Sequence, residues 1–231
     1  MGHYKGALKM TNVRNSELRE NRQNVITEEE FEEAIYNAEQ IPNEFLRLRA
    51  CAVLCLLRLT GKRRGEIAML PLDNFKTEKE FLKITFILEK KRKEKTLQKI
   101  STKSIPLSDP FTKPIIEYLN YLSKQKPKPK FWLPRAKSVF GTIIMIPEEH
   151  IGGRQVFNIV RGCSETIWCH LFRETVASDI VKQDNSIIAA FKVQRRLDLE
   201  DYRTGFRYVK RFAEDVIERE QKAKVDVIKR A

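Results

Sequence analysis

Hydrophobic and polar residues recur along most of this chain with a helical period. Residues 27–30, Thr-Glu-Glu-Glu, form a capping box, which predicts a helix start because the threonine hydroxyl can accept from the third glutamate's amide. The segment from Phe45 to Leu59 is apolar on nearly all sides, which predicts a central buried helix, and Gly61 should cap its C-terminus. After the capping box, apolar residues follow at helical spacing: Phe31, Ala34, Ile35 and Ala38.

The middle of the chain predicts a small sheet between helices. A short helix from Arg64 to about Leu70 should stop at Pro71. Residues 81–88 have a strand-like pattern, and a strongly basic stretch from Lys90 to Lys103 leads to a second strand that ends near residues 105–107. We predict that these two strands form a long hairpin.

The segments after this hairpin differ in how clearly they can be read. Residues 110–122 predict a helix, and residues 124–130 alternate lysine with proline, which is typical of an extended cationic loop. Residues 131–153 give no clear pattern. A short helix is predicted over residues 157–160.

The C-terminal third is again helical. Helices are predicted over residues 165–183 and 186–195, and a further short helix should carry Tyr208. Beyond it, Phe212, Val216 and Ile217 share one face of an amphipathic helix. Residues 1–24 are polar and basic with little periodicity, so we interpret them as an N-terminal arm or linker. The expected fold is α+β, mostly α with a small β-hairpin sheet, in one domain over residues 25–231 that includes the C-terminal helix.

The charge balance narrows the range of partners. Among 231 residues there are 44 Lys and Arg but only 31 Asp and Glu, a formal net charge of +13. An excess of cations favours a polyanion, because binding releases the counterions condensed on it. Nucleic acid is therefore the favoured partner, with a basic but otherwise ordinary enzyme as the alternative.

The cysteines and the hydropathy indicate the compartment. None of the four cysteines makes a Cys-x-x-Cys pair, and Cys51 and Cys55 would share one face of the buried helix as small hydrophobic residues rather than bind a metal or form a disulfide. The chain has no recognisable signal peptide and no apolar run of about 18 residues. We therefore expect a soluble cytoplasmic protein, associated with DNA and not with a membrane.

Two pairs of side chains suggest phosphate chemistry. His170 and Arg173 would share one helix face; a guanidinium fits phosphate oxygens bidentately, and an imidazole can shuttle a proton near neutral pH. Arg63 follows the glycine that should end the buried helix, and Glu66 could pair with it and fix its rotamer. Taken alone, the first pair also fits a surface contact, and the second also fits a helix-capping salt bridge.

Tyr208 is the candidate nucleophile, with Tyr202 as the next choice. A phenol with a pKa near 10 is inert unless cations stabilise the phenolate or a base removes its proton. Arg207 is adjacent in sequence but points elsewhere on a helix, so the help must come from a distant segment. A single tyrosine on an amphipathic helix is ordinarily a packing residue.

Three segments together resemble the tyrosine recombinases, the phage-integrase family. Residues 60–67, Thr-Gly-Lys-Arg-Arg-Gly-Glu-Ile, resemble the box of the family's first arginine. Residues 170–178, which begin His-Leu-Phe-Arg, resemble its His-x-x-Arg box, and residues 197–201 and 204–209 resemble its Leu-Gly-His segment and nucleophile helix. Their order and spacing also agree, over about residue 25 to the end of the chain.

The resemblance implies a catalytic domain that cleaves and rejoins double-stranded DNA as a site-specific recombinase. Arg63 and Arg173 would bind the non-bridging oxygens of the scissile phosphate, His170 would be the acid/base, and Tyr208 would form a 3′-phosphotyrosyl link. The family also uses a hairpin lysine as the acid; Lys91 is favoured, and Lys90, Lys93 and Lys103 compete with it. The reaction would need no cofactor, metal or ATP, and a homo-tetramer would form on DNA.

Two departures keep alternatives open. Leu199 stands where the family usually has a second histidine or a tryptophan, and a leucine cannot hydrogen-bond a phosphate. The family also places a core-binding domain before the catalytic one, whereas only about 25 residues precede it here. A catalytically impaired DNA-binding module and a type IB topoisomerase-like nicking-closing enzyme are the alternative functions.

Overall fold

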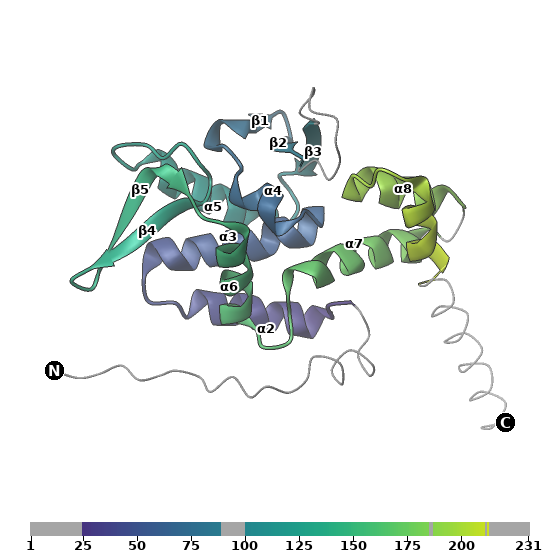
Figure 1. Cartoon of the computed structure of the whole chain (residues 1–231), viewed down its shortest axis with the longest axis horizontal. Coiled ribbons are helices and arrows are strands. Elements are labelled where there is room, and N and C mark those ends of the chain that lie inside the picture. The colour runs from purple at the N-terminus through teal and green to yellow at the C-terminus, as the bar shows by residue number, and fades with distance from the viewer. Residues whose placement is uncertain (1–24, 89–99, 185–186, 211, 213–231) are drawn as a thin grey trace.

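A computed structural model describes residues 25–88, 100–184, 187–210 and 212 (Figure 1). The predicted α+β class is confirmed: helices predominate, and the strands form two small antiparallel sheets. Predictions for residues 1–24, for Lys91 and for the helix beyond Phe212 lie outside the described residues. The elements are α2 (Glu28–Glu39), α3 (Glu44–Thr60), α4 (Arg64–Ala68), η1 (Leu72–Asn74), β1 (Phe75–Glu78), β2 (Phe81–Ile87), β3 (Ile100–Pro106), α5 (Thr112–Ser123), β4 (Pro134–Val139), β5 (Thr142–His150), α6 (Gly153–Cys163), α7 (Cys169–Gln183) and α8 (Ile187–Leu197).

Helix α3 is the centre of the main core, as its all-round apolar pattern predicts. The Asn43 side chain caps its start by accepting from the Leu46 amide, and Gly61 ends it in the left-handed conformation at φ 59°. Helices α2, α5, α6 and α7 all pack against α3. The capping box of α2 is also present, because Thr27 and Glu30 exchange side-chain-to-amide hydrogen bonds.

The predicted long hairpin is the β2–β3 pair, with β1 added on the other edge of β2. Alternate residues of β2 point into the core: Leu82, Ile84 and Phe86. The sequence did not indicate β1, because all four of its side chains are exposed or half-buried and it lacks alternation.

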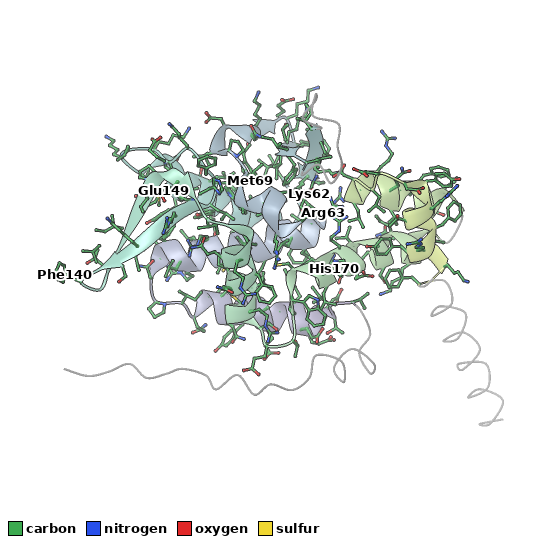
Figure 2. All side chains as sticks on the ribbon, in the orientation of Figure 1. Lys62, Arg63, Met69, Phe140, Glu149 and His170 are labelled. Carbon is green, nitrogen blue, oxygen red and sulfur yellow. The ribbon has the colours of Figure 1, made fainter. Side chains whose placement is uncertain are left out.

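The unassigned residues 131–153 contain a second hairpin, β4–β5. Only one of its faces packs on the core, through Ala136, Ile143 and Met145, so apolar residues on the other face obscure the alternation. Its turn carries the fully exposed Phe140, which lies at the far end of the molecule from Arg63 in Figure 2.

Two helices differ from the prediction by more than two residues at a boundary. Helix α6 is longer than residues 157–160, and its start is held by the Gln155 side chain, which accepts from the Gly152 amide. Helix α7 begins at Cys169 instead of residue 165, because the Ser164 hydroxyl accepts from the Thr166 and Ile167 amides and holds a turn there.

A second, smaller core joins α7, α8 and the helical residues 202–210 (Figure 1). Helix α8 and the helical residues 202–210 approach very closely at Gly205, where an added Cβ would lie 2.4 Å from the Ala190 carbonyl oxygen. The buried residues of this core are Val176, Ala177, Val181, Ala189, Val193, Leu197 and Phe212.

The cysteines are free and buried, in agreement with their interpretation as small hydrophobic residues. Burial is the main cause that raises the pKa of the Cys51 thiol to about 11. Within the described ranges, no group of three or more His, Cys, Asp and Glu side chains has a metal-binding arrangement. None of the described helices combines the length and the hydropathy that a membrane span needs.

Candidate active site

Arg63 is positioned by the start of helix α4. Its backbone amide donates to Glu66 Oε2 over 3.1 Å, and its Nη1 donates to Glu66 Oε1 over 3.0 Å. The Glu66 side chain is almost fully buried, whereas that of Arg63 is 32% exposed. The predicted pairing is therefore present: a buried carboxylate holds a guanidinium that remains accessible to a ligand.

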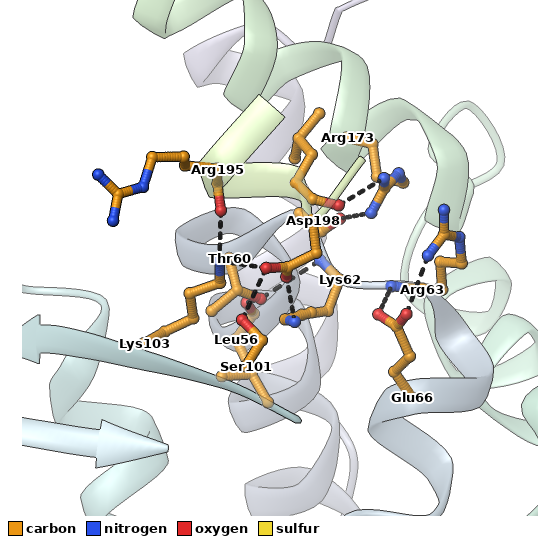
Figure 3. A network of polar contacts seen from close by, with 12 residues as sticks. Leu56, Thr60, Lys62, Arg63, Glu66, Ser101, Lys103, Arg173, Arg195 and Asp198 are labelled. Carbon is orange, nitrogen blue, oxygen red and sulfur yellow. Dashed lines mark hydrogen bonds and ion pairs between the residues drawn. The ribbon is translucent and has the colours of Figure 1, made fainter. Parts of the chain in front are cut away.

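Arg173 lies on α7 and is only 5% exposed. Its Nη1 donates to the Gly61 carbonyl oxygen over 2.7 Å, and its Nη2 donates to the Leu197 carbonyl oxygen over 2.9 Å (Figure 3). These carbonyls stand at the C-terminal ends of α3 and α8, where helix carbonyls lack intrahelical partners and carry partial negative charge. The guanidinium thus joins two helix ends that are distant in sequence.

The electrostatics of Arg173 indicate which groups surround it. Burial lowers the pKa of its guanidinium, and the charge of Arg63 lowers this pKa further. Tyr208, Glu66 and Asp198 act in the opposite direction and raise it. The contacts agree: Arg173 bonds Gly61, two residues before Arg63, and Tyr208 packs on the smaller core to which α7 contributes, so the three residues come from separate segments to one region of the fold.

Tyr208 lies on the helical residues 202–210 and is half-buried. Its ring stacks on Phe212, with centroids 6.4 Å apart, and it packs with Leu199 against the smaller core. The close contact of Gly205 with α8 fixes this helix one turn before Tyr208. Leu199 contributes packing here, as its apolar side chain requires.

His170 is accessible at the start of α7. Its side chain is 63% exposed, and its Nε2 lies 3.0 Å from Oε1 of Glu174, which is one turn further along α7. His170 lies on the same helix as Arg173, three residues before it. A carboxylate on one ring nitrogen fixes the orientation of an imidazole.

Among the hairpin lysines considered for the acid role, Lys103 is described and the others are not. Lys103 is buried, and its Nζ donates to Asp198 Oδ1 over 2.9 Å and to the Arg195 carbonyl over 2.7 Å. Its ammonium group therefore has one structural partner on α8 and one directly after it. Lys91, Lys90 and Lys93 lie outside the described residues, so the choice of Lys91 stays a prediction.

Sequence reasoning did not assign a role to Lys62 or Asp198. Lys62 is fully buried, and its Nζ lies 2.5 Å from Asp198 Oδ2 (Figure 3). Asp198 also accepts from Ser101 and has φ 50°, a left-handed conformation that suits aspartate better than most residues. The available sequence signal was the position of Lys62 directly after the glycine that ends an almost wholly apolar helix.

Comparisons with known proteins place this geometry on a known fold. The sequence matches no protein-family model and no curated protein. The structure is similar to the site-specific recombinase XerH bound to its difH substrate in a pre-cleavage complex, with a TM-score of 0.58 and 16% identity over 84% of this chain and 52% of XerH. It is also similar to the XerH post-cleavage complex, with a TM-score of 0.58 and 16% identity over 85% of this chain and 52% of XerH.

A third similar structure is the recombinase XerA, with a TM-score of 0.55 and 15% identity over 80% of this chain and 59% of XerA. The chain thus spans about half the length of XerH. Both relatives are tyrosine recombinases, and the similarity extends over most of the described elements. The chain therefore has the fold of the tyrosine-recombinase catalytic domain.

Proposed function

We propose that this chain is the catalytic domain of a site-specific DNA recombinase of the integrase type, which cleaves and rejoins DNA through a 3′-phosphotyrosyl intermediate. One observation supports the proposal: on a recombinase fold, Arg173 bonds the carbonyl of Gly61, two residues before Arg63, and Tyr208 packs on a core to which the helix of Arg173 contributes, although 110 and 35 residues separate the three in sequence. A phosphoryl-transfer site that uses no metal ion needs this combination of fixed cationic side chains and an oxygen nucleophile.

In the proposed cleavage step, Tyr208 Oη attacks the scissile phosphorus in line with the bond to the 5′-oxygen. The phenol loses its proton as the P–O bond forms, and the bond to the 5′-oxygen breaks. Negative charge builds on the non-bridging oxygens, where Arg63 and Arg173 donate hydrogen bonds. Because both arginines are already held by the fold, they stabilise this charge without reorganising.

His170 is the proposed acid/base. It is exposed, and its imidazole already has a carboxylate partner in Glu174. It would hydrogen-bond the phosphate and take or return the tyrosine proton. Lys91 is proposed as the acid that protonates the leaving 5′-oxygen, which gives a free 5′-hydroxyl.

Rejoining reverses these steps with the same or another DNA end. The 5′-hydroxyl attacks the phosphotyrosine, a DNA phosphodiester forms and the phenol leaves. Since the ester keeps the energy of the broken bond, exchange needs no ATP. Double-stranded DNA is the proposed partner, and strand exchange between two duplexes would use a homo-tetramer on DNA.

A catalytically impaired DNA-binding module is the second candidate, and two observations favour it. Leu199 offers no hydrogen bond where the family has a histidine or tryptophan, and both terminal nitrogens of Arg173 already bond backbone carbonyls. In this alternative the arginines would bind phosphate while no covalent step follows.

A nicked suicide substrate separates the candidates, because the fragment beyond the nick diffuses away and traps the covalent complex. The parent protein should form a protein–DNA band that survives denaturation, and Tyr208→Phe should abolish it while the DNA affinity stays the same. Tyr202→Phe is the matched control and should keep the band. DNA binding without a covalent band in the parent would support the binding module. Relaxation of supercoiled DNA without partner exchange would indicate a nicking-closing enzyme.

A further inference from the structure

Lys62 is an unusual residue for the interior of a protein. It is fully buried, its Nζ lies 2.5 Å from Asp198 Oδ2, and the same ammonium lies 4.3 Å from the centre of the Phe86 ring. Burial lowers the pKa of Lys62, and the hydrogen bond with Asp198 acts against that effect. A buried charge is retained at a cost, so its position calls for an explanation beyond general stability.

Asp198 is the hub of the contacts around Lys62. Its carboxylate accepts from Lys62, from Lys103 and from Ser101, and the last two belong to β3. It follows the end of α8 directly and adopts φ 50°. The carboxylate therefore ties the end of α8 to the hairpin and to the segment after α3.

The position of this ion pair relative to Arg173 is informative. Arg173 donates to the carbonyls of Gly61 and Leu197. Each of these residues directly precedes one member of the ion pair, so Lys62 follows Gly61 and Asp198 follows Leu197. The ion pair and the guanidinium thus close a ring through two short pieces of backbone (Figure 3).

We propose that Lys62 and Asp198 are positioning residues that fix the two carbonyls holding Arg173, and so aim its guanidinium at the scissile phosphate. The inference rests on the proposed function for the role of Arg173, but the ring itself does not depend on it. Two of the five guanidinium N–H groups bond to Gly61 and Leu197, which leaves three for a ligand. A fork held at two points loses little freedom when it meets a phosphate.

The first test is spectroscopic and needs no activity. In the parent protein, NMR of arginine side chains labelled with ¹⁵N should show slow rotation about the Cζ–Nη bonds of Arg173, because two carbonyls restrain it; loss of the signal in Arg173→Lys assigns it. Lys62→Met keeps the length and volume of the side chain and removes the ammonium. We expect Lys62→Met to accelerate that rotation, and unchanged rotation would overturn the inference.

The second test measures single-turnover formation of the covalent complex on the nicked substrate. Lys62→Met should slow cleavage about tenfold to a hundredfold while the DNA dissociation constant changes little, because a small misplacement of a catalytic group has such effects. The test is repeated on a substrate with a methylphosphonate at the scissile position, which lacks the negative charge that Arg173 would stabilise. On this substrate the cleavage rate of Lys62→Met should be within about twofold of the parent rate. An equal loss on both substrates would mean a general structural role and would overturn the inference.

Two further variants keep the test decisive. Lys83→Met removes an exposed lysine of β2 that pairs with Glu78, and it should leave both readouts unchanged. Asp198→Asn keeps the shape of the side chain and tolerates the left-handed conformation, so it should reproduce the effects of Lys62→Met if Lys62→Met fails to fold. If the parent forms no covalent complex, the proposed function fails, and the NMR comparison still decides whether the ion pair restrains Arg173.

Discussion

Arg173 Nη1 donates to the Gly61 carbonyl oxygen over 2.7 Å and thereby joins two residues that are 112 positions apart. This bond connects the box of the first arginine to that of the second. It makes Arg173 both a structural residue and a candidate catalytic residue, whereas Arg63 is held by a local contact with Glu66. The two arginines should therefore respond differently to substitution.

Arg173→Gln should destabilise the protein by about 2–3 kcal/mol, because two buried carbonyls lose their charged donor. Arg63→Gln should cost less, about 1 kcal/mol, because the buried Glu66 keeps the backbone amide of residue 63 as a donor and the glutamine amide can replace the guanidinium. Chemical denaturation measures both values. Both variants should nevertheless lose covalent complex formation, and equal stability losses would contradict the different roles inferred here.

Gly61→Ala should be destabilising by at least about 1–2 kcal/mol, the cost of a left-handed conformation for a residue with a Cβ. The φ of Gly61 is 59°, and the added Cβ would lie 2.6 Å from Leu197 Cδ2. Gly162→Ala is the matched control: nothing lies within 4 Å of its Cβ, and helix propensity predicts no loss. Thermal denaturation of the two variants provides the comparison.

Gly205→Ala should displace the helix of Tyr208, because the new Cβ would lie 2.4 Å from the Ala190 carbonyl oxygen, a backbone atom that cannot rotate away. We expect a lower melting temperature and a slower covalent step on the nicked substrate with DNA affinity retained. A variant that cleaves at the parent rate would show that this contact does not set the position of Tyr208.

Acid should destabilise the protein through Asp198. Burial acts to raise the pKa of this carboxyl, but hydrogen bonds from Lys62, Ser101 and Lys103 outweigh burial and hold the pKa below its ordinary value. A folded-state pKa below the unfolded one stabilises the fold above the unfolded value, about 3.9, and this contribution is lost as the pH falls through the folded pKa. Asp198→Asn should therefore flatten the acid limb of the stability profile in urea denaturation between about pH 5 and 2. An unchanged slope would argue against the contribution.

DNA binding should weaken steeply with salt, because the logarithm of the affinity falls by about 0.9 per phosphate neutralised for each unit of log salt. Lys128 and Lys130 already pair with Asp73 and Glu148, so removing either should change the slope little. Each alanine substitution among the lysines of residues 90–93 should reduce the slope by about 0.9, the contribution of one phosphate contact. Fluorescence anisotropy across a salt series measures the slopes, and a flat response would exclude phosphate binding by these residues.

Much of the fold could be predicted because local signals were strong. These signals depend on residues that are close together in the sequence: the Thr27–Glu30 capping box, the all-round apolar pattern of α3 and the Gly61 cap. Hairpin β4–β5 could not be predicted, since only one face is buried and the other mixes apolar and charged residues. The start of α7 was misplaced because a single hydroxyl, that of Ser164, decides between a turn and a further helical turn.

The candidate site could also be predicted only where local sequence patterns define it. Residues recognisable by type and spacing, such as Arg63 with Glu66, could be predicted, and their pairing is present. The ring around Arg173 could not, because it depends on backbone carbonyls, which no side-chain pattern encodes. The role of Asp198 could not be predicted either, because its partners lie more than 90 residues away in the sequence.

The exposed turn of β4–β5 has a practical consequence. Phe140 is completely accessible and an added Cβ at Gly141 would touch nothing within 4 Å, while Figure 2 places this turn at one end of the molecule, away from Arg63 and His170. Exposed loop tips accept insertions well. A fluorophore or affinity peptide attached there would serve in the proposed DNA-binding assays while leaving the contacts of Arg173 and Asp198 undisturbed.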